Sequence, residues 1–541
     1  MTRYILPLLQ STALCALFVV SAVADQGHQH DELTDLQLGS VHFPTSCAPG
    51  VQQNFERGVA LLHSFAFETA EATFRQVAAD DPQCAMAHWG IARTFSRWGT
   101  PNEKQLRQGW DEIKVAKSLH AKTARERDYI DASAAFYKNP GKKDGKRDER
   151  YLKGMEKVYR RYPDDHEGAA FYAFALMNSD GDDDPTHAKR KEAAAILEKL
   201  FVTEPNHPGV AHYLIHTYDY PGFAELGLPA ARRYAKIAPA APHALHMPSH
   251  IFAQLGLWQE DIESNLASVA ASRNAATTHM GDEGHQYHAM EFLMYAYLQS
   301  GREADAQKLI EDVRALPKMK SMYGDEDDPQ VLALVSYSAS YVLELHQWDK
   351  AADLAMTPGT AFGDDTITYL ARVVGAAHLG RADEARRSAA QIQSLYEQIV
   401  AKKMPWVDWA DQERKEADAW ADHAEGKDDQ ALALLREVEA KEKTGIFGAN
   451  GELPAHEMLA DMLLDMKRPG EALVEYEAEL KINPGRFDSV YGAGRAAEEL
   501  NMVDKANGYF GQLVRNCAGT SSSRPELAHA REVLAVMAKG N

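Results

Sequence analysis

Apolar residues recur every three to four positions along nearly the whole chain beyond residue 24, and no segment keeps a period of two for long. A period of about 3.6 gathers apolar side chains on one face of an α-helix, whereas a period of two is typical of a half-buried strand. Ala, Leu, Glu and Lys, which favour helices, dominate the same stretch. The pattern therefore predicts an all-α protein.

The helical pattern also repeats. A tetratricopeptide unit combines small residues, a large apolar or aromatic residue and a closing Pro at fixed spacings on two helices. Each such hairpin has an apolar face that it cannot bury alone, so neighbouring hairpins stack. We therefore expect a superhelical array of tetratricopeptide-like antiparallel helix pairs. The matches that carry this prediction are Gly58, Ala70, Phe74 and Pro82; Ala460, Ala472, Tyr476 and Pro484; Gly494, Ala506 and Phe510; and Ala193, Leu197 and Pro205.

The first 24 residues have the pattern of a secretory signal peptide. Arg3 precedes a mostly apolar run over residues 5–20, and Ala22-Val23-Ala24 has the small-x-small form of a cleavage site. We expect residues 1–24 to be removed, which would leave a periplasmic or secreted protein. No other stretch approaches ~18 uninterrupted apolar residues, so no membrane span is expected after cleavage.

Shifts in composition predict the organisation of the remaining chain. Residues 25–46 are polar and are expected to form a flexible N-terminal arm, and residues 317–329 are charged and punctuated by Pro and Gly, which is typical of a linker. We expect this acidic linker to separate a tetratricopeptide-like N-terminal half, residues 47–316, from a similar C-terminal half, residues 330–541.

Three cysteines, Cys47, Cys84 and Cys517, remain after the expected cleavage. In an oxidising compartment two of them could pair. Cys47 precedes the first strongly predicted helix and Cys84 follows its partner helix, so a bridge between them would pin the N-terminal edge of the array. The alternative is a pair of buried free thiols. A bridge requires Cα atoms ~4.4–6.8 Å apart.

Charge and motifs exclude several functions. The chain has 58 Lys and Arg against 79 Asp and Glu, a net charge of −21. A net-acidic surface repels phosphate backbones, so nucleic acid is not expected as a partner. The sequence contains no Walker loop, Rossmann glycine fingerprint, GxSxG elbow or CxxC pair, so we expect no nucleotide cofactor.

Histidines are concentrated in one segment. The 82 residues from His207 to His288 hold 9 of the 22 histidines, where even scattering would place about three. His212 and His216 are four positions apart, so both imidazoles project from one helix face. Pro248 suits the start of another helix, and the residue before Pro is disfavoured in the helical region. His243 and His246 are therefore expected on a loop, with His250 in the first helical turn.

Imidazoles with a nearby carboxylate form a coordination set for Zn, Cu or Fe. We expect His212, His216, His246 and His250 to point into one cavity, with the remaining candidates close behind. The alternative is a structural network of histidines that bond backbone carbonyls. His63 and His88 are expected to pack or to support the site rather than to bind metal. The candidate metal ligands are His212, His216, His243, His246, His250, His285, His288 and Glu291.

The segments HPGVAHYLIHTYDYP and APHALHMPSHIFAQLGLWQEDIESN resemble a family of exported bacterial tetratricopeptide-repeat proteins with HPGxAHYxIH and HxxHMPSHI blocks. The resemblance covers nearly the whole mature chain and implies a helical repeat fold without implying an activity. The chain departs from the family pattern at Tyr218-Asp219 and at Ala289. By their match to the blocks, the histidines that correspond to family positions are His207, His212, His216, His243, His246, His250 and His288.

Three functions remain open at this point. The first is a repeat protein that binds a protein or peptide partner in its concave groove and a transition metal at its histidines. The second is a metal-dependent periplasmic enzyme, an oxidoreductase or hydrolase, because catalytic zinc or copper needs protein ligands and one open position. The third is a purely structural scaffold, which the absence of a separate catalytic motif favours.

Overall fold

The computed structural model describes residues 37–96, 101–180, 184, 186–277, 284–319, 328–360, 362–404, 406–441 and 453–540. Within these ranges the chain is helical and contains no β-strand, so the prediction of an all-α protein is confirmed. The expected signal peptide, residues 1–24, lies outside the described residues, as do residues 25–36 of the expected arm.

The helices of the N-terminal part are η2 (Pro49–Val51), α1 (Gln52–His63), α2 (Phe67–Asp80), α3 (Ala85–Thr94), α4 (Glu103–Ser118), α5 (Ala124–Tyr137), α6 (Arg147–Arg161), α7 (His166–Asn178), α8 (Ala188–Thr203), α9 (Pro208–Tyr218), α10 (Ala224–Ile237), α11 (Pro242–His246), α12 (Pro248–Gln254) and α13 (Trp258–Thr277). Those that follow are α14 (His285–Gln299), α15 (Glu303–Ala315), α16 (Pro329–Glu344), α17 (Trp348–Ala352), α18 (Asp365–His378), α19 (Ala382–Lys402), α20 (Val407–Ala424), α21 (Asp428–Glu439), α22 (Ala455–Asp465), α23 (Pro469–Ile482), α24 (Phe487–Glu499), α25 (Val503–Asn516) and α26 (Pro525–Gly540).

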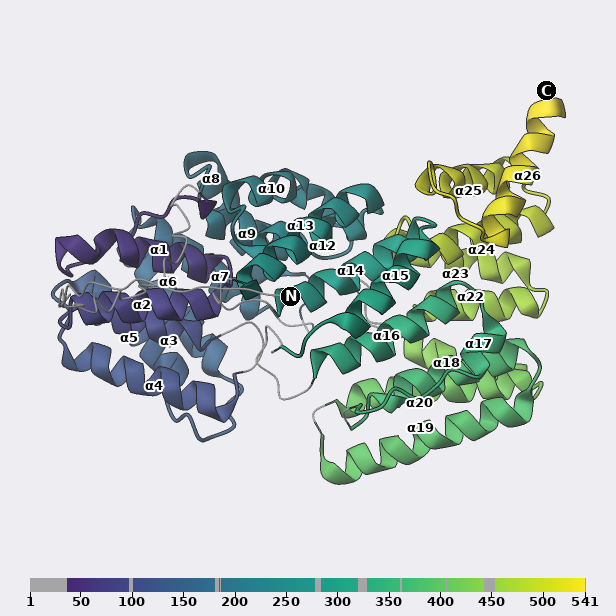
Figure 1. Ribbon diagram of the computed structural model, residues 1–541, viewed down its shortest axis with the longest axis horizontal. Helices are drawn as coiled ribbons and strands as arrows, with labels where there is room; N and C mark the ends of the chain where they lie inside the picture. The colour runs from purple at the N-terminus through teal and green to yellow at the C-terminus, as the bar shows by residue number, and fades with distance from the viewer. Residues whose placement is uncertain are drawn as a thin grey trace, which may run out of the picture. The chain divides into compact units, whose positions relative to one another are not determined.

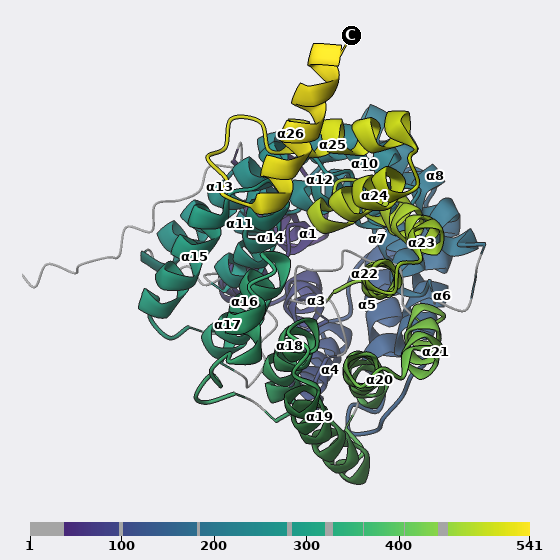
Figure 2. The same cartoon turned by 90° about the vertical axis from the view of Figure 1, so that its right-hand side faces the viewer.

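Many of the helix pairs share one form of turn. In each, a residue with positive φ lies two positions after the first helix, here called the A helix, and two positions before the second, the B helix. The A helices α16, α18, α20, α22 and α24 follow one another, with their B helices outside them (Figure 2). The same turn therefore recurs through much of the array. The residues in this position are Phe65, Gly256, Gly301, His346, Gly380, Gly426, Lys467 and Asn501.

Small residues on A helices pack against aromatic residues on B helices. A Cβ placed on Gly58 of α1 would lie 2.6 Å from the ring of Phe74 on α2, and one placed on Gly494 of α24 would lie 2.5 Å from the ring of Phe510 on α25. The aromatic ring thus fills the space that the small residue leaves, as the sequence pattern requires. The packing confirms tetratricopeptide-like antiparallel pairs, which stack in chain order (Figure 1).

Contacts between distant A helices show a superhelical path in the C-terminal part of the array. Gln299, the last residue of α14, accepts a hydrogen bond of 2.7 Å from the N–H of Phe487, the first residue of α24. Arg486 forms buried ion pairs with Glu344 at 2.7 Å and with Glu457 at 2.6 Å. These bonds hold the start of α24 beside the ends of α14 and α16, so the A helices turn back toward earlier ones.

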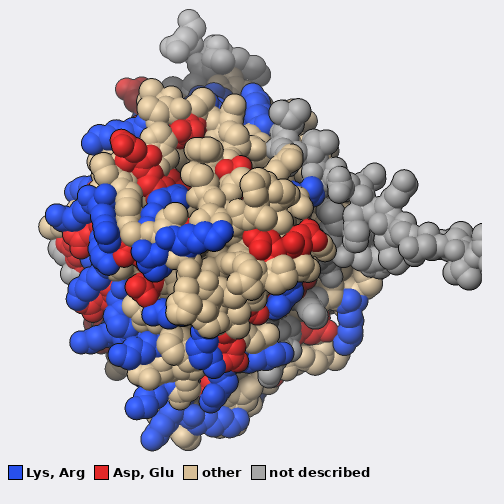
Figure 3. Space-filling view, turned by 90° about the vertical axis from the view of Figure 1, so that its left-hand side faces the viewer, with Lys and Arg blue, Asp and Glu red and all other residues tan. Residues whose placement is uncertain are grey.

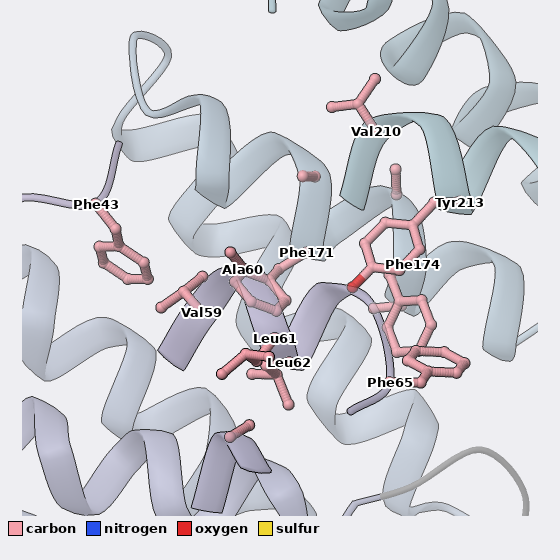
Figure 4. Packing of buried hydrophobic residues seen from close by; sticks show 14 of the residues in the cluster. Phe43, Val59, Ala60, Leu61, Leu62, Phe65, Phe171, Phe174, Val210 and Tyr213 are labelled. Carbon is pink, nitrogen blue, oxygen red and sulfur yellow. The ribbon is translucent and has the colours of Figure 1, made fainter. Parts of the chain in front are cut away.

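Residues 37–46 are packed, so the expected flexible arm over 25–46 does not extend to them. Phe43 is fully buried, and its ring centroid lies 5.4 Å from those of both Phe55 and Trp89 (Figure 4). The N–H and Oγ of Ser46 donate hydrogen bonds of 2.6 and 2.7 Å to the carboxylate of Glu126. A few apolar residues in a polar stretch are enough to fix this segment, because each finds a preformed pocket between helices.

Cys47 and Cys84 form a disulfide, with their Cα atoms 4.8 Å apart, so the predicted bridge is confirmed. Cys517 is buried and not bonded to another cysteine. The bridge ties the packed N-terminal segment to the start of α3.

Helix contacts cross the expected linker at residues 317–329, and the division into two halves there stays a prediction. Residues 320–327 lie outside the described residues, but the flanking helices pack together. Nε2 of Gln330 donates to the carbonyl of Val313 at 2.7 Å, and the hydroxyl of Tyr337 donates to the carbonyl of Tyr287 at 3.1 Å. One apolar cluster includes residues from both sides, because α16 continues the array.

Among the described residues, no helix combines the length and apolarity needed to cross a membrane. The chain has a net charge of −21, yet Lys and Arg are numerous on the face shown in Figure 3, with Asp and Glu among them. The expectation that nucleic acid is not a partner remains a prediction from net charge.

Candidate metal centre

Three consecutive A-helix positions of the array supply the clustered histidines. α9 carries His212 and His216, and the short helices α11 and α12 together take the place of the next A helix. α14, which follows, carries His285 and His288. Because stacked pairs place successive A helices side by side, residues far apart in sequence meet here.

Two local expectations need correction. His243 and His246 lie in α11 rather than on a loop, and Met247 has helical angles, φ −51° and ψ −33°, although Pro follows it. The steric preference of a pre-proline residue is overcome because Met247 is fully buried and its N–H donates to the carbonyl of His243 at 2.9 Å. His250 lies in the first turn of α12, as predicted.

The first group of histidines, here called the His246 triad, consists of His246, His250 and His288. Nε2 of His246 lies 3.0 Å from Nε2 of His250. One ring nitrogen from each member lies within 4.8 Å of the others, and the ring centroids of His246 and His288 are 4.4 Å apart. The 3.0 Å separation of His246 and His250 suits two nitrogens that share one ion at ~2.0–2.1 Å, with a nitrogen of His288 nearby.

The tautomer of His246 is fixed by Asn265 on α13. Nδ1 of His246 lies 2.6 Å from Oδ1 of Asn265. The amide of Asn265 cannot be reversed without losing a bond, since its Nδ2 donates to the backbone carbonyl of Asp261 at 3.1 Å. Oδ1 accepts, so the proton of the neutral ring is on Nδ1 and its lone pair is on Nε2.

Carboxylates fix the other two rings of the triad in the same way. Nδ1 of His250 donates to Asp219 at 2.8 Å, and Nδ1 of His288 donates to Glu291 at 2.9 Å. Their lone pairs are therefore also on Nε2. Two lone pairs 3.0 Å apart repel unless a cation lies between them, and a proton can join only two nitrogens. Two facing lone pairs with a third imidazole beside them therefore favour a metal ion, with the carboxylates orienting its ligands.

The second group, here called the His212 triad, consists of His212, His216 and His243, whose ligand nitrogens also lie within 4.8 Å of one another. Nδ1 of His212 donates to the carbonyl of His63 at 2.6 Å, and its Nε2 lies 3.1 Å from Nε2 of His243. Nδ1 of His243 is buried and has no hydrogen-bond partner among the described residues. The ring of His243 can therefore carry its proton on Nε2 and donate it to His212.

The two triads are adjacent. The ring centroids of His216 and His250 are 6.1 Å apart, and those of His243 and His246 are 6.0 Å apart. His285 is buried with its ring 5.2 Å from that of His243. The candidates thus form two neighbouring sets rather than one cavity: His243 and His288 belong to the sets, while His285 and Glu291 lie behind them.

Burial keeps four of the clustered histidines neutral. Burial lowers the pKa of His212 to about 3, although the carbonyl of His63 acts in the opposite direction. Burial, reinforced by the neighbouring histidines, lowers the pKa values of His216, His243 and His246 well below 6.5. Neutral imidazole is the form that binds metal, so protons compete weakly for these ligands near neutral pH.

His207 lies in a third group that needs no cation. Glu167 accepts hydrogen bonds of 2.8 Å from Nε2 of both His63 and His207. Nδ1 of His63 accepts from the hydroxyl of Tyr213 at 2.8 Å, and Nδ1 of His207 accepts from the N–H of Val210 at 3.2 Å, which caps α9. Burial alone would raise the pKa of Glu167, but the contacts with His207 and His63 lower it. Every proton has an acceptor, so this group is structural.

This structural group supports the His212 triad. Gly209 allows α9 to approach the ring of His63, which a side chain at that position would overlap. The adjoining aromatic residues Phe65, Phe174 and Tyr213 lie together in Figure 4. The ring of Phe65 lies 4.4 Å from that of His212, centroid to centroid. The HPG motif thus places α9 against α1.

His88 and Cys84 are not members of either triad. Nδ1 of His88 pairs with Glu112 at 2.7 Å, and Cys84 is in the disulfide. His279 lies outside the described residues. Sequence reasoning missed Asp219 and Asn265 as orienting groups. Asp219 follows the His212–His216 helix directly, and that position was the available clue, whereas Asn265 is distant in sequence and no spacing pointed to it.

Comparisons with known proteins identify no family. No protein-family model and no curated protein matches the sequence. Among solved structures, the human IFIT1 dimer with m7Gppp-AAAA is similar over 85% of this chain and 95% of that chain, with 13% identity and a TM-score of 0.35. The P58(IPK) TPR domain is similar over 84% of this chain and 99% of that chain, with 14% identity and a TM-score of 0.21. At TM-scores below 0.5 we base no argument on these similarities.

Proposed function

We propose that the protein binds zinc or copper at the His246 triad and, more weakly, at the adjacent His212 triad. One observation carries the proposal: one ring nitrogen of each of the three histidines lies within 4.8 Å of the others, while each Nδ1 is held by a side-chain oxygen. Imidazole ligands suit zinc, copper and iron, but the ferrous facial triad includes a carboxylate ligand. Neither triad has one, which favours zinc or copper over iron.

Metal analysis of protein purified without a His tag tests this proposal. We expect at least one zinc or copper ion per chain, and a double His212→Ala, His250→Ala variant should lose it with helix content nearly unchanged. His88→Ala, which removes a histidine paired with Glu112 outside the cluster, is the matched control. Metal content at background in the wild-type protein would contradict the proposal and favour a structural network.

A metal-dependent enzyme is a second candidate, and one feature favours it. His216 lies on the wall of a cavity of ≈ 420 Å³, so the His212 triad adjoins space for a small molecule. Catalytic zinc and copper keep an open coordination position. Cobalt-substituted protein should then change its visible spectrum on adding azide. An unchanged spectrum would indicate that the ion is closed off and would count against an enzyme.

The expected cellular location and partner belong to the same proposal. The Cys47–Cys84 disulfide supports a periplasmic or secreted protein, because such bonds persist in oxidising compartments. Helical repeats commonly use their extended surface to bind a protein or peptide, and we retain that partner alongside the metal. Fractionation of the producing cells, with the redox state of the two cysteines measured by alkylation, tests the location.

A further inference from the structure

Four successive helix pairs have expanded turns between their A and B helices. The standard turn spans three residues, as residues 64–66 do between α1 and α2. The corresponding segments of the next four pairs are longer: residues 95–102, 138–146, 179–187 and 219–223. Insertions in repeat proteins gather on one face, which is often the binding face.

Described residues from three of these turns line the ≈ 420 Å³ cavity that reaches His216, and Phe136 and Asp148, which flank the fourth turn, line it as well. Its wall includes Arg93 and Ser96 at the end of α3, Asn178 and Asp180 at the end of α7, and Asp219 after α9. A volume of this size holds a small molecule. Longer turns gathered at one hollow are consistent with a binding site there.

Arg93 is a buried cation without a partner in this cavity. Its side chain is 4% exposed, and its guanidinium lies 4.3 Å from the centroid of the Tyr151 ring. Among the described residues it makes no ion pair and donates no hydrogen bond, and its Nε is fully buried. The hydroxyl of Tyr151, which also lines the cavity, is likewise buried without a partner. Buried guanidinium groups are normally paired with an anion.

Two neighbouring arginines have hydrogen-bond acceptors for their guanidinium groups. Arg190, on the same wall, bonds Asp180 at 3.2 Å and the carbonyl of His216 at 2.9 Å. Arg147, nearby on α6, donates to four backbone carbonyls. Unlike these two neighbours, Arg93 has no hydrogen-bond acceptor among the described residues.

The acidic residues of the cavity limit the negative charge that a bound ligand can carry. Asp180 is engaged by Arg190, and Asp219 by His250. Asp148 also lines the cavity and lies outside ion-pair distance of Arg93, and burial raises its pKa. These carboxyls oppose a dianion such as phosphate more than a monoanion. Phe136 and Phe174 supply an apolar wall for the rest of a ligand.

We propose that this cavity binds a small organic monocarboxylate with an apolar body, its carboxylate held by Arg93 and its other end directed toward His216. The approach of the ligand to a metal ion rests on the proposed function, whereas the contact with Arg93 does not. Arginine binds carboxylates through paired, charge-assisted hydrogen bonds, which is the chemistry that Arg93 lacks within the chain.

Calorimetric titration with acetate, benzoate, 3-phenylpropionate, 3-phenylpropionamide and inorganic phosphate tests the proposal. We expect 3-phenylpropionate to bind about tenfold or more tightly than its neutral amide and than phosphate. Arg93→Gln should abolish the preference for acid over amide, and Arg93→Lys should retain part of it. Arg107→Gln, which changes an exposed arginine on α4, is the control.

Thermal unfolding of the same variants distinguishes a ligand-binding role of Arg93 from a structural one. Without ligand, Arg93→Gln should melt no lower than the wild-type protein, since it removes an unpaired buried charge, and the acid should raise the melting temperature of the wild-type protein alone. A lower melting temperature for the ligand-free variant would show a structural role and overturn the proposal, as would equal binding of acid and amide or no saturable binding of any acid. The acid titration is repeated after a chelator has removed any metal. Acid binding that persists would show that the contact with Arg93 does not depend on the metal proposal.

Discussion

The His246 triad and the His212 triad each contain three imidazoles at similar spacing, yet their surroundings differ. In the His246 triad each Nδ1 donates to a side-chain oxygen, from Asn265, Asp219 or Glu291. In the His212 triad, His212 donates to a backbone carbonyl, and Nδ1 of His243 has no partner among the described residues.

The difference shows that histidines lying close together are weaker evidence for a metal site than histidines whose tautomers are fixed by neighbouring groups. His212 and His243 can satisfy each other with an ordinary hydrogen bond of 3.1 Å. When both rings are neutral, His246 and His250 cannot do so, because each carries its proton on Nδ1. A protein that holds three lone pairs together without a cation would lose stability at that site, so the His246 triad should bind metal more tightly.

Removing a ligand of the tighter site should have the largest effect. His250→Ala should abolish the tight ion while leaving a weaker one at the His212 triad, because the two sets share no ligand. Competition titration with a chromophoric chelator measures both affinities. His216→Ala is the reciprocal variant, and loss of the tight ion from that variant instead would reverse our ranking of the triads.

Changing the group that orients His250 should have the next largest effect. Asp219→Asn keeps an acceptor but removes the charge, and such changes cost about 10–100-fold in metal affinity. The loss should fall on the His246 triad alone. Asp180→Asn is matched to it, since Asp180 lines the same cavity but bonds Arg190 instead of a triad histidine. Equal losses in the two variants would show that general cavity charge, not orientation, determines affinity.

The close approach of α9 to His63 gives a way to disturb the His212 triad. Gly209→Ala forces a methyl group against the His63 ring, and overpacking of this kind costs about 1–3 kcal/mol. Because the carbonyl of His63 holds His212, affinity at that triad should fall while the His246 triad keeps its ion. Denaturant unfolding measures the stability. Gly508→Ala, on an open helix surface, should cost nothing.

Stepwise removal of metal with a chelator should reveal the smallest effect, the difference in metal affinity between the two triads. If side-chain control of tautomers strengthens binding by about tenfold, or ~1.4 kcal/mol, ions should leave in two stages, with the His212 triad emptied first. Melting temperature measured at each chelator concentration should fall in two steps, since each bound ion stabilises the folded state. A single step would indicate one ion shared by the cluster.

Short-range features were predictable from the sequence. The contacts of Gly58 with Phe74 and of Gly494 with Phe510 follow from spacing within one repeat, and the Cys47–Cys84 bridge spans a single predicted hairpin. These features depend on a helical period and on one turn. The sequence spacing therefore contains what is needed to place them.

Features that depend on stacking were not predictable. The separation into two triads, and the pairing of Asn265 with His246, arise from the angles at which α9, α11, α13 and α14 meet. The order in residues 37–46 depends on Phe43 finding space between helices that are distant in sequence. No periodicity in one sequence specifies such contacts.

Anomalous diffraction at the zinc and copper absorption edges, from crystals of the untagged protein, tests the central claim most directly. We predict a peak at the point shared by His246, His250 and His288, bonded to their three Nε2 atoms at ~2.0–2.1 Å, with Nδ1 still facing Asn265, Asp219 and Glu291. The absence of a peak there, with the imidazoles rotated to donate to one another or to water, would contradict it.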